Sequence, residues 1–267
     1  MLGPVLQTVK NFLVFRHLVV HMIKTDIRGR FAGSSMGLFW NFIHPFIMLL
    51  VFLFVFVYIF RLRIPEHAGS TGAAVYIMAG LFPWMALAEG LNRSTTSLIE
   101  NATLIQKTVF PTEILIAKAV ITPFSTHGIA IALLALYMLA TAHNTAALLM
   151  IPFVVGLQVV FTIGVGFIFA SLAVLLRDTV QILQLVINFW LYITPILYPL
   201  SMLPSWSQGL MSANPVYPFV TIYQSLYLRG SIGDGTLLVL ALGWSLLSYA
   251  VGSIVFSRLK GEFSDWL

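Results

Sequence analysis

Long uncharged apolar runs, separated by short polar stretches, dominate this sequence. The clearest run extends from Leu38 to Phe60 without one formal charge. It has about the 20 residues that a helix needs to cross a bilayer core. Similar runs recur along the chain, and the pattern predicts six membrane-spanning helices at 37–60, 73–91, 114–140, 146–176, 179–200 and 236–256. We therefore expect an all-α membrane protein with a single transmembrane domain over residues 1–267.

The N-terminal segment, residues 1–30, predicts an amphipathic helix that lies at the membrane interface. Basic and histidine side chains share one face at helical spacing, and apolar side chains lie opposite. The polar face carries Lys10, His17, His21, Lys24 and Arg28, and the apolar face Phe12, Phe15 and Val19. Asp26 interrupts the apolar face, so we expect the helix to end near it. The helix is either a generic anchor or a cuff around a cytoplasmic entrance.

Two further segments outside the spans have patterns of their own. Ser97–Thr108 predicts a short amphipathic helix, and Pro111 ends the segment. Residues 201–234 are only half apolar and contain several prolines. That composition indicates short re-entrant or interfacial helices before the last span, a form that membranes tolerate where protein covers the backbone.

Small residues precede the first span at four-residue spacing: Gly29, Gly33 and Gly37. Glycines at this spacing let a neighbouring helix approach closely. The alternative is a flexible lead into the helix, and the sequence favours neither reading.

The distribution of charge predicts the orientation in the membrane. The chain is 59% hydrophobic and 9% charged, whereas soluble domains have about 25% charged residues. With six spans, eleven of the 14 Lys and Arg residues fall on the side of the termini. Cytoplasmic loops carry the excess of basic residues, so we expect both termini in the cytoplasm. We read the net charge of +5 as a topological signal and expect no nucleic-acid partner.

The sequence lacks the residues that several classes of function need. It contains no phosphate-binding G-x-x-x-x-G-K-[ST] loop, no cysteine, and no histidine spacing typical of a metal site. Carboxylates are scarce in the apolar runs, with Glu89 and Glu113 near span ends. This scarcity argues against a proton-coupled carrier and against an enzyme. We expect no catalytic residue, no metal and no cofactor in this chain, and infer a conduit that is driven from elsewhere.

Aromatic side chains gather in the first and fifth predicted spans. Aromatic faces pack well against sugar rings, although they also fill membrane cores and interface belts. Asparagines in the same spans offer groups for sugar hydroxyls. The candidate channel residues are Phe39, Trp40, Asn41, Phe42, Asn188, Phe189, Trp190, Tyr192 and Tyr198.

Several motifs, in order, resemble the permeases of polysaccharide-exporting ABC transporters. Ile27–Pro45 (IRGRFAGSSMGLFWNFIHP) is similar to their opening, and Ala79–Leu115 to their second span and coupling segment. Tyr192–Pro204 and Asn214–Phe219 resemble their fifth span and external re-entrant region, and the final RLKGEFSDWL is similar as well. The resemblance covers nearly the whole chain. Members export O-antigen, capsule and teichoic acid.

The resemblance implies a homodimeric channel in the bacterial inner membrane, with two copies of a separate ATPase that binds ATP and Mg²⁺. The substrate would be a lipid-linked polysaccharide, with O-antigen the leading candidate, that moves from cytoplasm to periplasm. Contacts to the ATPase would come from Glu100, Asn101, Ile105, Lys107, Phe110, Pro111 and Glu113. Thr112 departs from the basic residue expected there. The basic residues Lys24, Arg28 and Arg30 are where a lipid pyrophosphate would be attracted.

Three alternatives remain at this point. One is export of capsule or teichoic acid, and another is a drug or lipid export permease of the same superfamily. A third, from another class, is a membrane-embedded enzyme that modifies glycans, which would need clustered acid–base residues. A neighbouring ATPase gene among glycosyltransferase genes would favour polysaccharide export, whereas an ATPase gene alone would favour the drug or lipid permease.

Overall fold

The computed structural model describes residues 2–30, 36–59, 69–108, 110–141 and 146–267. Gly33 and the side chain of Asn41 lie outside the described part, so the predictions for them stay predictions. Within these ranges every regular element is helical. The fold is therefore all-α, as predicted.

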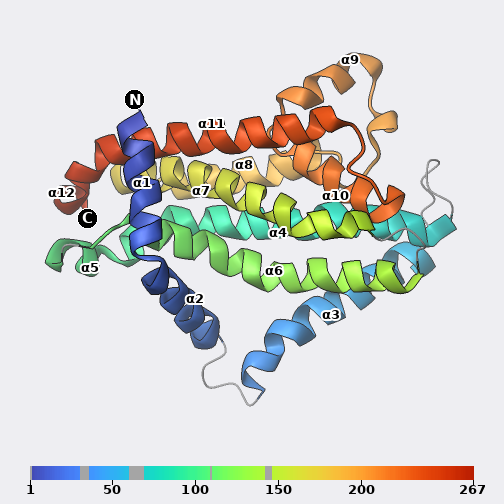
Figure 1. Ribbon diagram of the computed structural model, residues 1–267, viewed down its shortest axis with the longest axis horizontal. Helices are drawn as coiled ribbons and strands as arrows, with labels where there is room; N and C mark the ends of the chain where they lie inside the picture. Colours follow the sequence, from blue (N-terminus) through green and yellow to red (C-terminus); the bar gives the residue numbers. More distant parts are fainter. Residues whose placement is uncertain (1, 31–35, 60–68, 109, 142–145) are drawn as a thin grey trace.

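Four long helices form the body of the molecule: α4 (Gly69–Glu100), α6 (Glu113–Thr141), α7 (Ile151–Leu175) and α11 (Gly235–Leu259). They run roughly along the long axis in Figure 1, and each is long and apolar enough to cross a membrane. Helix α4 is central, because 78% of its most apolar window is buried inside the protein, against 28% for α11. Both termini lie at the same end of the bundle (Figure 1).

The first and fifth predicted spans are represented by shorter apolar helices. Helix α3 (Trp40–Leu53) follows a 3₁₀ turn, and a π-helical segment, Phe54–Ile59, continues it. Helix α8 (Thr179–Ile193) is shorter than the predicted 179–200. It ends there because Thr194, which precedes Pro195, has an extended backbone (φ −84°, ψ 135°), and a proline disfavours the helical conformation of the residue before it.

The predicted helix Ser97–Thr108 is wrong in its first part. Helix α4 continues to Glu100, well beyond the predicted end of the second span, and α5 covers only Ala102–Lys107. The hydroxyls of the polar residues in this part of α4 bond to carbonyls of the preceding turn, as Ser and Thr inside a helix do. Thr95 Oγ1 donates to the Leu91 carbonyl at 2.8 Å, and Ser97 Oγ to the Ser94 carbonyl at 2.7 Å.

The N-terminal segment forms two helices, α1 (Leu2–Val14) and α2 (Arg16–Arg30). All five polar-face residues of the predicted amphipathic helix are exposed, and Val19 is buried. Phe12 stacks on Phe167 of α7 with ring centroids 6.4 Å apart. The expected end near Asp26 is wrong, because α2 runs on to Arg30.

Residues 201–234 contain short helical segments rather than a long helix. Between α8 and α11 lie two 3₁₀ turns, Leu200–Met202 and Gly209–Ala213, with α9 (Ser205–Gln208) between them, and then α10 (Tyr217–Arg229). Helix α10 packs on α4 and is buried along most of its length. Gly230, with φ +62°, ends it.

Among the described glycines, the tightest contacts are those between α7 and α11, away from the predicted glycine ladder. A Cβ atom on Gly164 would lie 2.3 Å from the backbone carbon of Ser248, and one on Gly252 would lie 2.0 Å from the Gly164 carbonyl oxygen. Gly29 and Gly37 have no atom within 4 Å of such a Cβ, and Gly37 has φ +51°. Within this chain, neither described ladder position is in close contact with another helix, and close packing in the assembled complex stays a prediction.

The α7–α11 contact makes a test of the fold. Gly252→Ala should lower expression and the melting temperature of the purified protein strongly, because backbone atoms cannot yield to the new methyl group. Gly243→Ala on the same helix, where a Cβ meets nothing within 4 Å, should be neutral or stabilise by about 0.5–1 kcal/mol. Equal melting temperatures for Gly252→Ala and the parent would contradict this helix packing.

Candidate functional site

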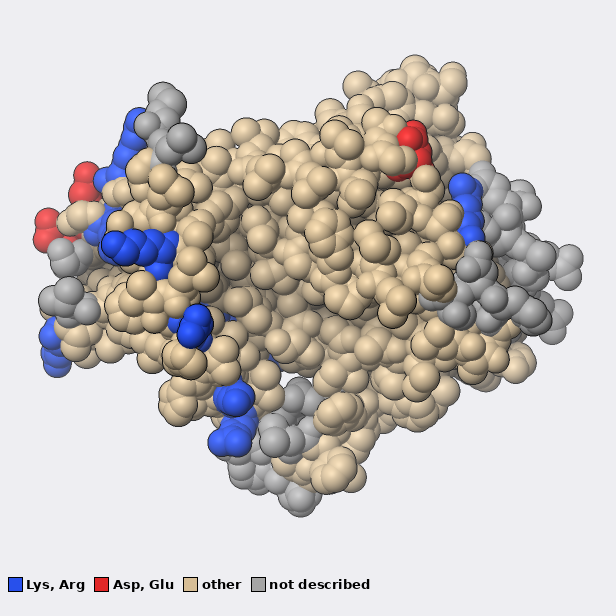
Figure 2. Space-filling model, viewed as in Figure 1, with Lys and Arg blue, Asp and Glu red and all other residues tan. Residues whose placement is uncertain are grey.

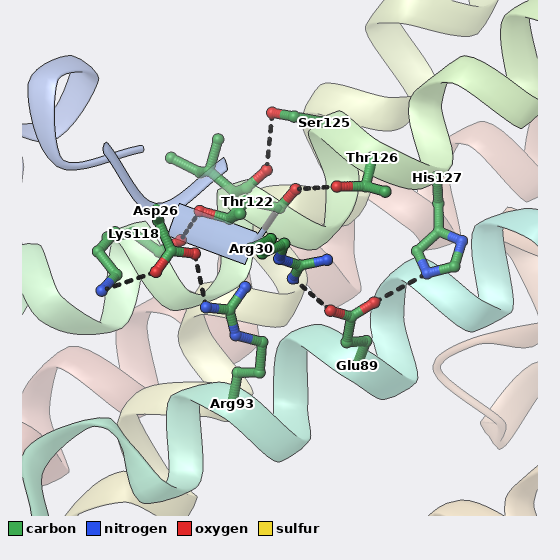
Figure 3. A network of polar contacts seen from close by, with 10 residues as sticks. Asp26, Arg30, Glu89, Arg93, Lys118, Thr122, Ser125, Thr126 and His127 are labelled. Atoms are coloured by element: carbon green, nitrogen blue, oxygen red, sulfur yellow. Dashed lines mark hydrogen bonds and ion pairs between the residues drawn. The ribbon is translucent and has the colours of Figure 1, made fainter. Parts of the chain in front are cut away.

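A network of charged side chains joins α2 to α4 and α6 (Figure 3). The carboxylate of Asp26 accepts from Arg93 Nη2 at 2.5 Å and from Lys118 Nζ at 3.2 Å. One turn further along α2, Arg30 pairs with Glu89. The other oxygen of Glu89 lies 3.0 Å from His127 Nε2 on α6.

The network explains why α2 does not end at Asp26. Its side chains are only 14–33% exposed, and a charge removed from water is tolerated when it is paired. Asp26 therefore faces the bundle, and its ion pairs bind the last turns of α2 to α4 and α6. What looked like a break in the apolar face is the residue that anchors the helix.

The network contains more positive than negative charge. Its two carboxylates, Asp26 and Glu89, face the cations Arg30, Arg93 and Lys118 as well as His127. Arg93 Nη1 is buried and has no hydrogen-bond partner within the described residues. Beside the network lies a cavity of about 500 Å³ lined by His21, Met22, Thr25, Asp26, Gly29, Arg30 and Lys118. This arrangement can accept a further anionic group.

The predicted pyrophosphate residues occupy two different environments. Lys24 and Arg28 are exposed on α2, as a site of first contact would require. Arg30 is instead bound to Glu89 inside the network. Sequence reasoning missed Arg93, Lys118 and His127 as partners of these residues. The signal was available, since each is an ionisable residue in or next to an apolar run, and such residues pair with one another.

Positive charge gathers at the end of the molecule that carries the termini. Figure 2 shows Lys and Arg side chains mainly over that end and a broad uncharged band across the middle of the visible face. An uncharged band of this kind is what a lipid-facing surface needs, because charge is costly in hydrocarbon.

Three of the predicted coupling residues, Ile105, Phe110 and Pro111, line a hollow at the same end. Glu100 and Lys107 are exposed, Ile105 and Phe110 are partly buried against the core, and Asn101 donates to the Ser97 carbonyl at 2.8 Å. The hollow has a volume of about 370 Å³ and is lined by Phe15, Ile105, Thr108, Phe110, Pro111, Thr112 and Lys260. Thr112 is 3% exposed, and its hydroxyl has no partner among the described residues.

Glu113 differs from the other residues of the coupling set, because it is 5% exposed. Its carboxylate accepts from Lys260 Nζ at 2.9 and 3.0 Å and from Asn11 Nδ2 at 3.3 Å. In this arrangement it binds α1 and the C-terminal segment to α6 and has no free oxygen to present to a partner. Any part it plays in coupling would therefore pass through Lys260.

The aromatic residues predicted for the channel divide into exposed and packed groups. Phe39, Phe42, Phe189 and Tyr192 are 59–72% exposed, and Asn188 is exposed next to Phe189 on α8. Trp40 is 37% exposed. On α8 a shallow apolar groove of about 470 Å³ is lined by Ile182, Leu185, Val186, Phe189, Trp190 and Ile193.

Trp190 and Tyr198 are tied to the protein itself. Trp190 Nε1 donates to Asn214 Oδ1 at 2.8 Å, and its ring meets the edge of Trp84 at a centroid distance of 6.0 Å. The Tyr198 hydroxyl donates to the Tyr192 carbonyl at 2.7 Å. These two residues hold the end of α8 against the loop that follows, so their loss would disturb structure as well as any contact with a substrate.

The arrangement defines a class of protein: a helical membrane domain with a basic end, a hollow beside a short helix, and no phosphate-binding loop in its sequence. Residues 17–228 match the ABC-2 type transporter family. The chain belongs to this family.

Individual relatives match over nearly the whole chain. An O-antigen export system permease protein, RfbA, from Myxococcus xanthus is 25% identical over 97% of this chain and 99% of its own length. The corresponding protein from Klebsiella pneumoniae is 28% identical over 94% of this chain and 95% of its own length. A polysialic acid transport protein, KpsM, from Escherichia coli is 22% identical over 92% of this chain.

The ion pairs of Asp26 make stability depend on pH. Burial raises the pKa of the Asp26 carboxyl, but the hydrogen bond and charge of Arg93, together with Lys118, outweigh it and leave the pKa below its ordinary value of 3.8. A group with a lowered pKa stabilises the fold above its unfolded pKa and loses that effect as pH falls through the folded value.

We therefore expect Asp26→Asn to lower the stability of the purified protein by about 1–3 kcal/mol at neutral pH, between the ranges for exposed and buried pairs. The difference from the parent should shrink as the pH falls below 3.8. Melting temperatures measured across this pH range would show it. Asp178→Asn, which changes an exposed carboxylate with no capping hydrogen bond, should have little effect. A pH-independent loss at position 26 would argue for packing instead of charge.

Proposed function

We propose that this chain is the membrane subunit of an ATP-driven exporter that moves a lipid-linked polysaccharide, most closely of the O-antigen class, from cytoplasm to periplasm. The observation that carries the proposal is the end-to-end similarity to O-antigen export permeases, which covers 94–97% of this chain. Capsule export is the second candidate, because the polysialic acid transport protein matches 92% of the chain.

The proposed topology has six spans and cytoplasmic termini in the bacterial inner membrane. Helix α3 and the π-helical segment after it continue without interruption from Trp40 to Ile59, about the length that a span requires. Helix α8 is shorter, and we propose that the segment up to Leu200 completes its crossing. The shared end of the two termini and the basic side chains around it support a cytoplasmic assignment (Figures 1 and 2).

ATP hydrolysis would take place on a separate subunit. We propose a homodimer of this chain with two ATPase copies, in which ATP and Mg²⁺ are bound by the partner. The hollow beside α5 is lined by the partly buried Ile105 and Phe110, and Glu100 and Lys107 are exposed nearby in the sequence. A surface of this kind can receive a side chain of a partner and transmit its motion to α4 and α6.

Substrate would reach the channel through the basic face of α2. Lys24 and Arg28 are exposed and can attract a lipid pyrophosphate from the cytoplasmic leaflet. The network behind them has surplus positive charge, and Arg30 is held there by Glu89. We propose that the pyrophosphate competes with Glu89 for Arg30, which would loosen the attachment of α2 when substrate arrives.

The function is tested by deletion of the gene followed by location of the polymer. We expect the deletion strain to lack surface polysaccharide and to accumulate lipid-linked polysaccharide on the cytoplasmic side. Surface polysaccharide should return when the parent gene is restored. Normal surface polysaccharide in the deletion strain would refute the proposal. Accumulation of a capsule polymer instead of O-antigen would select the second candidate.

Charge reversal beside α5 tests the coupling. Lys107→Glu and Glu100→Lys, introduced separately into the restored gene, should reduce export several-fold while the protein level in the membrane stays unchanged. The measurement is surface polysaccharide together with co-purification of the ATPase. Arg258→Glu, at an exposed position at the end of α11, controls for loss of positive charge at this end. Parent-like export and co-purification in both coupling variants would contradict the assignment.

The exposed aromatics of α8 test the path of the polymer. Weak stacking contacts are worth about 0.5–1.5 kcal/mol each, so Phe189→Ala or Tyr192→Ala should slow export roughly two- to tenfold, and the double variant more. Phe153→Ala removes an exposed aromatic from α7 and should leave the rate unchanged. Photo-reactive groups at 189 and 192 should capture glycan during transport; capture of bulk lipid alone would show that this face is lipid-exposed.

A further inference from the structure

A second polar cavity lies at the end of the bundle opposite the termini. It has a volume of about 330 Å³ and lies between the start of α4, the segment after α8, and α10. Its polar side chains include Tyr76, Gln208, Tyr217, Thr221, Gln224 and Ser225. The volume is at the small end of the range for ligand pockets, and the wall is far more polar than the apolar groove on α8.

Hydrogen bonds to backbone carbonyls fix two walls of this cavity. Gln224 Nε2 donates to the Pro195 carbonyl at 3.1 Å, and the Tyr76 hydroxyl is 3.2 Å from the same carbonyl oxygen. Gln208 Nε2 donates to the Leu203 carbonyl at 2.8 Å. In both glutamines the amide nitrogen thus donates to a backbone carbonyl of the protein itself. Their amide oxygens accept no hydrogen bond in the described part of the chain, so they remain available as acceptors.

Hydroxyl groups provide the complementary donors. Ser225 is 7% exposed and lines the cavity without a hydrogen-bond partner among the described residues. Thr221 Oγ1 is fully buried and has no partner within the same part of the chain. The Thr221 hydroxyl is too enclosed to be reached from the cavity, so among these hydroxyls it is that of Ser225 that a ligand in the cavity can pair with.

The combination of donors and acceptors selects the chemistry of the ligand. Most oxygens of a phosphate or sulfate can only accept hydrogen bonds. They would be repelled by the amide oxygens, which are acceptors too. An acyl chain would leave every one of these polar groups unpaired. A polyol both donates and accepts hydrogen bonds, so it matches the amide oxygens and the hydroxyl of this wall.

We infer that this cavity is a binding site for a single sugar residue of the exported glycan, at the end where the polymer leaves the membrane. The inference rests on the proposed function for the identity of the ligand and for the side of the membrane. The site is separate from the basic face of α2 and from the aromatic face of α8. It would hold the leading sugar weakly and let the next residues follow.

The test measures binding of sugars to the purified full-length protein in lipid nanodiscs. The probes are the surface polysaccharide of the same cells, released from lipid by mild acid, and methyl glycosides of neutral hexoses and of a uronic acid. The test variant is Ser225→Ala, which removes an unpaired hydroxyl of the cavity wall with little change in volume. The control is Ser212→Ala, whose exposed hydroxyl bonds to the Gly209 carbonyl of its own turn.

The parent and the control should bind the polysaccharide or a glycoside equally, and the test variant roughly two- to tenfold more weakly, as the loss of one ordinary hydrogen bond predicts. The melting temperature of the test variant should equal or exceed that of the parent, because an unpaired hydroxyl is removed. Inorganic phosphate should not compete. Ser201→Trp, which fills the cavity from its exposed rim, should also abolish binding and keeps the test decisive if the first variant is unstable.

The inference is overturned if the parent binds none of the probes, if either cavity variant binds as the parent does, or if phosphate displaces the sugar. These outcomes differ from failure of the proposed function. Normal surface polysaccharide in the deletion strain would refute export whether or not the cavity binds sugar. Export without any effect of the cavity variants on binding would refute the sugar site alone.

Discussion

Pairing of partly buried charge is the constraint on which the end of this structure that carries the termini depends. Asp26, Arg93 and Lys118 come from three different helices, and none of them can be left unpaired at such low exposure without a large cost. Their mutual contacts determine where α2 lies against α4 and α6. The position of α2 in turn determines where its exposed basic face is presented. A single carboxylate thus links the stability of the domain to the surface that we propose meets the substrate.

Close contact between backbones holds the long helices together, as charge pairing holds α2 to the bundle. Between helices in lipid, packing must supply the attraction that water supplies elsewhere. Gly164 and Gly252 allow α7 and α11 to touch through backbone atoms. Polar groups inside the bundle are satisfied at the same time: Gln158 donates to the Pro83 carbonyl at 3.1 Å and accepts from the Tyr223 hydroxyl at 3.1 Å. These two hydrogen bonds join α7 to α4 and to α10.

The two ends of the bundle are chemically different, which suits one-way transport. The end with the termini carries the basic face of α2 and the hollow beside α5. The opposite end carries the cavity around Gln224. Its wall is polar, and Arg229 is the one charged residue among those that line it. An anionic head group would be favoured at the first end, and a hydroxylated chain at the second. The uncharged band between them is where the lipid lies in our proposal.

The sequence by itself determined the helical class, the positions of the long helices α6 and α11 to within a few residues, and the exposure of the basic face from Lys10 to Arg28. These properties follow from the periodicity of apolar and polar residues along each helix, which does not depend on the partners of that helix. Only the tertiary structure decided the partners of Asp26 and Glu89, the burial of Glu113 by Lys260, and the glycines that matter for packing. It also showed that Trp190 is bound to Asn214. Such contacts join residues far apart in the chain, and no spacing along one helix specifies which face of another helix it will meet.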